Sequence, residues 1–186
     1  MLKKFNVSVH PAKAPSIMEV IWSPPLAGWI KCNTDGSSNT IASSCGGIFR
    51  DSNANFISCF AENIGGGSAF HAELPAIMRA VEIANQRRWT NLWIESDSSL
   101  AVMAFNNSSM IPCCLRNRWI NCRNMLYHMN FLITHIYREE NRCADKLASK
   151  GLEIQGVTIW LQMLEFLNCL FVHDSLGLPS FRVSNV

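Results

Sequence analysis

The amino-acid sequence predicts an α/β fold in which a five-stranded mixed sheet is flanked by helices. The length of 186 residues suits one domain. Hydrophobic residues make up 48% of the chain and charged residues 16%, a composition typical of a protein with a packed core and not of a disordered chain. Three strand-like segments are followed by a helix, a strand, two helices, a strand and a helix. This order, without an internal repeat, is typical of helices packed on a mixed sheet.

The first part of the chain supplies three strands. Residues 1–28 contain several prolines and show no periodicity, which predicts a tail or linker. Apolar and polar side chains alternate over residues 29–35, as in a half-buried strand. Short apolar runs follow at 46–50 and 56–60, and the polar residues between them predict a hairpin.

Helical periodicity begins after a glycine-rich loop that ends in Ser68, a candidate helix cap. Apolar residues recur at helical spacing over 71–85. Residues 92–94 are a short apolar strand, and a helix capped by Ser98 or Ser99 follows.

The last third of the chain is predicted to continue with helices around one strand. Residues 115–125 are amphipathic, 131–137 are strand-like, and 141–150 form a helix that Gly151 ends. The apolar stretch at 157–172 predicts a further helix, which packs on the domain by default or else on a partner. The predicted organisation is a tail or linker, one domain and a C-terminal helical extension, at residues 1–28, 29–151 and 152–186.

Charge and cysteine usage restrict the function classes. The net charge of +2 is too near zero to indicate a nucleic-acid binder by itself, so any basic surface must be local. The eight cysteines form no CxxC pair or zinc-finger spacing, and no secretory signal is evident, so we expect reduced thiols in an intracellular protein of the nucleus or cytoplasm. No stretch reaches the roughly 18 apolar residues of a membrane span. We expect a monomer without a membrane partner.

Four acidic residues lie at or near the ends of predicted elements: Asp35, Glu73, Asp97 and Asp145. If the strands carrying Asp35 and Asp97 are parallel neighbours, both carboxylates point into one crevice, and the two helices flank it. Converging carboxylates need a cation, and oxygen ligands favour Mg²⁺, with Mn²⁺ as an alternative. The alternative without a metal site is that each acid is a helix cap or a solvated surface group. We expect the neighbouring Glu95 to be such a solvated group.

Five motifs occur in order along the chain: NTDGSS (33–38), GGIFRD (46–51), HAELPAI (71–77), WIESDSSLAV (93–102) and REENRCADKLAS (138–149). Together they resemble the ribonuclease H fold, and in particular the plant branch of ribonuclease H-like domains related to the module of non-LTR retrotransposons. The resemblance covers about residues 22–151. It implies a two-metal endonuclease that hydrolyses the RNA strand of RNA–DNA hybrids.

The resemblance also implies roles for individual residues. Asp35, Glu73, Asp97 and Asp145 would be the catalytic residues and the ligands of two Mg²⁺ ions. Gly36, Ser37, Arg138 and Asn141 would contact the hybrid, which is recognised by its shape and 2′-hydroxyls.

The sequence departs from the family pattern at several positions. No mobile histidine precedes the last acid, and we interpret His135 as a structural residue of its strand. Residues 107–118 lack a basic protrusion, so affinity for phosphates is expected to be modest. Pro75 requires the helix to begin near His71 or Ala72. Ala54 takes a hairpin position suited to glycine, where a left-handed conformation is strained.

Three hypotheses remain open on the sequence alone. The first, which the four acids favour, is an active metal-dependent nuclease. The second is a catalytically impaired nucleic-acid-binding module of transposon origin, and the third is a protein–protein module or inert remnant. Cleavage with Mg²⁺ would separate the first from the second, and hybrid binding in Ca²⁺ the second from the third.

Overall fold

The computed structural model describes residues 15–66 and 69–184, which form two sheets and five α-helices within those ranges. The strands are β1 (Ser16–Val20), β2 (Ile30–Ser38), β3 (Ser43–Arg50), β4 (Phe56–Gly65), β5 (Asn91–Ser96), β6 (Asn130–His135), β7 (Val157–Trp160) and β8 (Ser180–Ser184). The helices are α1 (Ala69–Gln86), α2 (Ser99–Asn106), α3 (Arg116–Leu126), α4 (Arg142–Gly151) and α5 (Asn168–Ser175). Ser68, the expected cap of α1, lies outside the described residues.

The main sheet is mixed, as the sequence predicts, but it has six strands instead of five. Its order is β6-β5-β2-β3-β4-β7. β2, β3, β4 and β7 pair antiparallel, whereas β5 and β6 run parallel to β2. The parallel pairs require crossover connections, which α1 and the α2–α3 segment provide.

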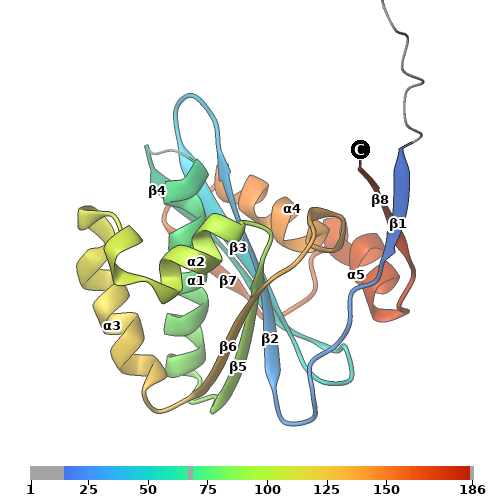
Figure 1. Cartoon of the computed structure of the whole chain (residues 1–186), viewed down its shortest axis with the longest axis horizontal. Coiled ribbons are helices and arrows are strands. Elements are labelled where there is room, and N and C mark those ends of the chain that lie inside the picture. Colours follow the sequence, from blue (N-terminus) through green and yellow to red (C-terminus); the bar gives the residue numbers. More distant parts are fainter. Residues whose placement is uncertain (1–14, 67–68, 185–186) are drawn as a thin grey trace, which may run out of the picture.

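Helices cover both faces of this sheet (Figure 1). α1 packs on β2 and β3 with α2 and α3 beside it, and α4 packs on the opposite face with α5. The larger core cluster lies under α1 and includes Phe49, Phe60, Leu74 and Ile94. A smaller cluster under α4 is centred on Leu147.

Two glycines allow the helices to approach the central strands. A Cβ on Gly36 would lie 2.5 Å from the backbone nitrogen of Glu73, and one on Gly46 would lie within 2.5 Å of the Leu147 carbonyl carbon. A larger residue at either position would push α1 or α4 away from the sheet.

The N-terminal segment is only partly the linker that the sequence predicts. Residues 1–14 lie outside the described range, but β1 follows and pairs antiparallel with β8 as a separate two-stranded sheet. Val20 and Trp22 are buried, with Trp22 in a small cluster that includes Ala54. The expectation of a featureless linker was wrong here because the apolar partners of this segment come from distant parts of the chain.

The predicted helix at 157–172 was also wrong. β7 occupies the first four residues and pairs with the open edge of β4, and only the last part of the stretch is helical, in α5. Short apolar runs are ambiguous between strand and helix. Here the unpaired edge of β4 favours a strand over a helix, and the sequence pattern does not show that this edge is available.

Pro75 lies in the second turn of α1, because the helix begins at Ala69 and not near His71 or Ala72 as expected. Pro75 is itself buried, next to Leu74 and Ala76 of the apolar layer, and it also lines a pocket together with His71 and Arg118. Burial in this layer offsets the loss of the backbone hydrogen bond that a proline cannot donate.

Candidate metal and active site

The parallel pair β2–β5 brings Asp35 and Asp97 together. The last residues paired in register are Thr34 and Ser96, and the two carboxylates belong to the residues that follow them, Asp35 within β2 and Asp97 directly after β5. β2 continues to Ser38 alongside β3, whereas β5 ends at Ser96. The edge of β2 on the β5 side is therefore unpaired from Asp35 onward. The parallel register confirms the expectation that the two strands are parallel neighbours.

Glu73 completes a cluster of three carboxylates. It lies on α1, whose backbone contacts Gly36, the residue after Asp35. One carboxylate oxygen of each of Asp35, Glu73 and Asp97 lies within 4.8 Å of the other two. We call these three residues the acidic cluster. The hydroxyl of Ser96 lies 3.5 Å from Glu73 Oε2 and donates a hydrogen bond to it.

Electrostatic repulsion in the acidic cluster is strong. Burial and, after it, the charges of Glu73 and Asp97 raise the pKa of Asp35 to about 9. Burial and the charge of Asp97 raise the pKa of Glu73 to about 8. The cluster therefore favours protons or a cation over three free carboxylates. Its donors are all oxygen atoms, which fits a hard divalent cation such as Mg²⁺.

Asp145, the fourth predicted ligand, lies at the rim and not within the acidic cluster. It is on the first turn of α4, with 37% of its side chain exposed, and Arg138 Nη2 lies 3.4 Å from its Oδ1. Its charge nevertheless contributes to the raised pKa of Asp35. The structure thus brings three of the four predicted ligands together and leaves the fourth nearby, paired with an exposed arginine.

Asn141 differs from its expected place on the substrate side. It is only 1% exposed, and its Nδ2 donates to the Thr34 carbonyl at 3.0 Å and to Asp97 Oδ1 at 3.1 Å. It therefore orients Asp97 and ties the start of α4 to β2. Its Oδ1 is buried and accepts no hydrogen bond from the described residues.

The remaining predicted site residues surround the acidic cluster. Gly36 serves the packing of α1 on β2, and Ser37 is half-buried beside it in β2. Arg138 is exposed in the 3-10 turn Arg138–Glu140 before α4. His135 is the exposed last residue of β6, where its ring contacts Tyr137 edge-on.

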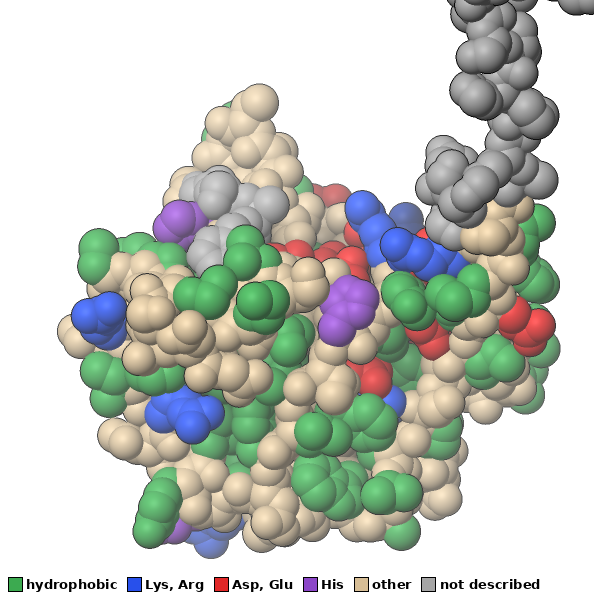
Figure 2. All heavy atoms as spheres, viewed as in Figure 1, with side chains coloured by type: hydrophobic (Ala, Val, Ile, Leu, Met, Phe, Trp, Pro, Cys, Tyr) green, Lys and Arg blue, Asp and Glu red, His purple; other side chains and the backbone are tan. Residues whose placement is uncertain are grey.

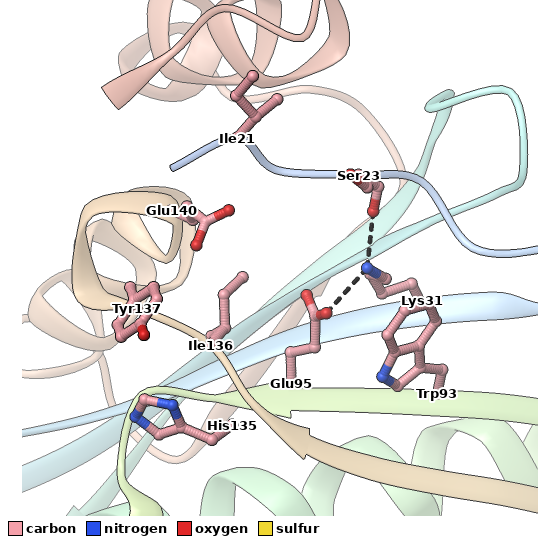
Figure 3. A pocket seen from close by; sticks show the side chains of 9 residues that line it. All are labelled: Ile21, Ser23, Lys31, Trp93, Glu95, His135, Ile136, Tyr137 and Glu140. Atoms are coloured by element: carbon pink, nitrogen blue, oxygen red, sulfur yellow. Dashed lines mark hydrogen bonds and ion pairs between the residues drawn. The ribbon is translucent and has the colours of Figure 1, made fainter. Parts of the chain in front are cut away.

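Glu95 was expected to be solvated, and this was wrong. It is 7% exposed and accepts a hydrogen bond from Lys31 Nζ at 2.9 Å. The pair lines a cavity of about 300 Å³ beside the acidic cluster, between the N-terminal segment and the ends of β5 and β6 (Figure 3). Sequence reasoning missed this pair because its two members are far apart along the chain.

Figure 2 shows acidic side chains at the surface in the upper middle of the molecule, with Lys and Arg side chains beside them. Basic residues of the α4 region include Arg138 and the exposed Lys146. No helix in the part of the chain that the structure describes combines the length and apolarity needed to span a membrane.

Residues 33–151 match the family model described as reverse transcriptase-like. The chain is also similar to an Arabidopsis thaliana protein named "Putative ribonuclease H protein", with 29% identity over 200 residues. That match covers 95% of this chain and 31% of the relative, so the chain spans about a third of the length of this curated relative.

Solved structures with the same fold are ribonucleases H and a viral protease-reverse transcriptase. RNase H1 from the archaeon Halobacterium salinarum has a TM-score of 0.60 and 22% identity, covering 67% of this chain and 98% of its own. LC11-RNase H1 from compost, in complex with an RNA/DNA hybrid, has a TM-score of 0.58 and 21% identity, covering 67% and 96%. The foamy viral protease-reverse transcriptase has a TM-score of 0.54 and 20% identity, covering 78% and 22%. At these identities the likeness establishes the fold alone.

Proposed function

Because the chain belongs to the reverse transcriptase-like family and has the ribonuclease H fold, we propose that it is a metal-dependent endonuclease that hydrolyses the RNA strand of RNA–DNA hybrids. The observation that carries this proposal is the acidic cluster at the open end of β2 and β5. A ribonuclease H fold with a buried, strongly repelling set of carboxylates at that place suits metal-assisted hydrolysis better than passive binding.

The acidic cluster fits the metal ions that such chemistry requires. Three oxygen donors within 4.8 Å of one another, two of them with raised pKa values, favour a divalent cation at neutral pH. Two bound Mg²⁺ ions would activate the attacking water and stabilise the leaving oxygen. Mn²⁺ also prefers oxygen ligands and would fit the same site.

Each side chain of the site has a different proposed role in binding the metal ions. Asp35 is the most buried carboxylate and faces the other two, so we assign it the central ligand position. Asp97 is oriented by the amide of Asn141. Asp145 would complete the set from α4 once its contact with Arg138 is exchanged for a cation. Arg138 is then available to a phosphate of the substrate.

The proposed substrate is an RNA–DNA hybrid, and the LC11 enzyme of the same fold was solved with such a hybrid. Gly36 is closely packed against α1, so its role is to place Glu73, while Ser37 and Arg138 remain candidates for contact with the nucleic acid. The net charge of +2 agrees with modest affinity.

A second candidate function is hybrid binding without cleavage. The position of Asp145 favours it, because this carboxylate lies outside the acidic cluster and is paired with Arg138. Catalysis requires ligands held within about 0.5 Å of their productive geometry. If Asp145 does not join the other ligands, the chain would bind a hybrid without hydrolysing it.

A cleavage assay on labelled hybrid separates these functions. The wild-type chain is incubated with Mg²⁺ or EDTA beside Asp97→Asn, and Glu165→Gln serves as an exposed acidic control on the C-terminal extension. We expect RNA cleavage only with Mg²⁺, a loss of about 10²-fold or more in Asp97→Asn, and full activity in the control. If neither the wild type nor Asp97→Asn cleaves the RNA while both bind the hybrid in Ca²⁺, the result would contradict nuclease activity and support the binding module.

A further inference from the structure

We propose that a buried polar network positions the strand ends that carry Asp35 and Asp97, and that Trp22 and Asp174, from opposite ends of the chain, are its outer positioning residues. The polar network consists of Trp22, Lys31, Asn33, Arg50, Glu95 and Asp174. The inference rests on the proposed function, because it concerns the geometry of the metal ligands.

The inner part of the polar network joins β2 to β5 just before the two carboxylates. Asn33 and Glu95 are paired in register, and Asn33 Nδ2 donates to Glu95 Oε2 at 3.0 Å. Asp35 and Asp97 each follow two residues later. Because alternate residues of a strand share a face, the orientation of this pair is passed on to the ligand side chains.

Lys31 fixes the other side of Glu95. Its Nζ donates to Glu95 Oε1 at 2.9 Å and to the Ser23 carbonyl at 2.6 Å, and it lies 3.6 Å from the centre of the Trp93 ring (Figure 3). Both carboxylate oxygens of Glu95 are therefore engaged, one by Lys31 and the other by Asn33. The N-terminal segment is connected to β5 through this lysine.

The outer part of the polar network reaches both terminal segments of the described chain. Asn33 Oδ1 accepts from Trp22 Nε1 at 2.9 Å and from Arg50 Nη2 at 3.3 Å. Arg50 Nη1 donates to Asp174 Oδ2 at 2.9 Å, and its guanidinium lies 3.9 Å from the centre of the Trp22 ring. Trp22, which precedes β2, thus holds Asn33 directly, and Asp174 of α5 holds it through Arg50.

Stability alone does not explain why these charges are buried. The side chains of Arg50 and Asp174 are 0% and 4% exposed. Desolvation of such a pair cancels much of its attraction, and apolar replacements of similar size are often neutral or stabilising. What a buried polar network does provide is a single geometry, here at the residues next to the acidic cluster. Of the buried Arg50 guanidinium, both Nη atoms donate hydrogen bonds within the network, whereas Nε has no partner among the described residues.

Two variants test the proposal without depending on an intact ion pair. Trp22→Phe keeps an aromatic ring but removes the donor to Asn33. Trp119→Phe is its matched control, because Trp119 Nε1 of α3 donates instead to the Phe105 carbonyl of α2. The double variant Arg50→Met/Asp174→Leu replaces the buried pair by apolar side chains. Thermal melts establish that each variant is folded.

The first readout is Mn²⁺ affinity of the full chain, measured by calorimetry. We expect about 10-fold weaker binding in Trp22→Phe and in the double variant, as for other residues that orient metal ligands, and unchanged binding in Trp119→Phe. Folded variants with wild-type Mn²⁺ affinity would overturn the proposal. A merely structural role would lower the melting temperature without changing the affinity of the folded protein.

Hydrogen–deuterium exchange supplies a readout that needs neither metal nor activity. We expect faster exchange in the variants at residues 33–37 and 95–97, and unchanged exchange in α1 and α3. Uniform acceleration, or none, would overturn the proposal. A wild-type chain that binds Mn²⁺ but cleaves no hybrid would refute the proposed function and leave this inference standing.

Discussion

Arg88 ends α1 in a backbone conformation that residues with a Cβ rarely adopt. Its φ is +56°, and only Ala54 shares a positive φ among the non-glycine residues that the structure describes. The Arg88 amide donates to the Asn85 carbonyl and the Trp89 amide to the Ala84 carbonyl, which is the Schellman pattern of a helix C-terminus. The pair Arg87–Arg88 therefore belongs to a solvated helix end.

We predict that Arg88→Gly stabilises the protein by about 0.5–1 kcal/mol, because glycine removes the left-handed strain at an exposed position. This corresponds to a rise of about 2–4 °C in Tm per kcal/mol for a chain of this size. Arg87→Gly is the control, since Arg87 has no positive φ and its guanidinium lies 5.5 Å from the centre of the Trp89 ring. A lower Tm for Arg88→Gly in thermal melts would contradict the prediction.

Ala54 shows how the same strain is tolerated elsewhere. Its φ of +60° confirms the left-handed conformation expected from the hairpin sequence. Its methyl group is buried against Trp22 and Ile136, so the strain is offset by apolar contact that glycine would lose. Local sequence predicts the conformation, but the compensating contact depends on a segment more than thirty residues upstream.

In the candidate site, too, neighbouring residues predict some features, whereas others depend on contacts between residues far apart in the chain. Asp35 ends one predicted strand and Asp97 follows another, so the sequence predicts their convergence if those strands are parallel neighbours. The burial of Glu95 and Asn141 is not predictable in this way, because each polar side chain is satisfied by a partner from another element. Sequence patterns show that a polar residue exists but not which distant group will pair with it.

Among the elements, β4, α1 and α3 are joined by four charged side chains. Glu62 of β4 accepts two hydrogen bonds from Arg79 of α1, at 2.6 and 2.7 Å. Arg118 of α3 makes a similar pair with Glu82 of α1 and lies 3.6 Å from Glu62. Although burial alone raises it, the pKa of Glu62 is lowered by the hydrogen bonds from Arg79 and the charge of Arg118.

We predict that Glu62→Gln lowers the free energy of unfolding by about 1.5–3 kcal/mol at pH 7, as for hydrogen bonds to charged groups. Because the pKa of Glu62 is lowered from 4.5, its contribution is present above pH 4.5 and is lost as the pH falls through the folded-state value. Denaturant titrations from pH 7 to pH 3 should therefore show the difference between the two stability curves shrinking as the pH falls below 4.5.

Glu165→Gln is the matched control for this pH dependence, because Glu165 is exposed on the extension and its replacement removes the same charge. Its stability curve should follow that of the wild type throughout. A difference between wild type and Glu62→Gln that persists at pH 3 would mean that side-chain packing, not the charge, accounts for the effect.

Elements with strong periodicity were predictable, and those that depend on a vacant edge were not. The amphipathic pattern of residues 71–85 predicts α1 almost to its C-terminus. β7 forms because β4 offers unpaired backbone groups, a property of the assembled sheet and not of residues 157–160.

In the whole molecule, the two ends of the described chain meet on one side of the domain. β1 and β8 form a two-stranded sheet whose side chains are mostly exposed (Figure 1). α5, in contrast, inserts Asp174 against buried Arg50 and packs Phe171 edge-on against Phe56. The C-terminal extension therefore consists of an integral helix and a peripheral strand.

This division predicts different effects for two truncations. Removing residues 177–186 deletes β8 and should change Tm by no more than about 2–4 °C, since little apolar surface is lost. Removing 168–186 also deletes α5 and leaves the Arg50 guanidinium buried without its carboxylate, which costs about 3–5 kcal/mol. Thermal melts of both truncated chains beside the full chain measure the difference.

A rescue variant distinguishes the unpaired charge from general loss of packing. In the chain lacking residues 168–186, Arg50→Met removes the buried cation, so Tm should recover in part, whereas in the full chain the same substitution should lower Tm by leaving Asp174 unpaired. A substitution that lowers Tm in both backgrounds would mean that the contacts of the Arg50 side chain with Trp22 and Asn33, not its ion pair, dominate.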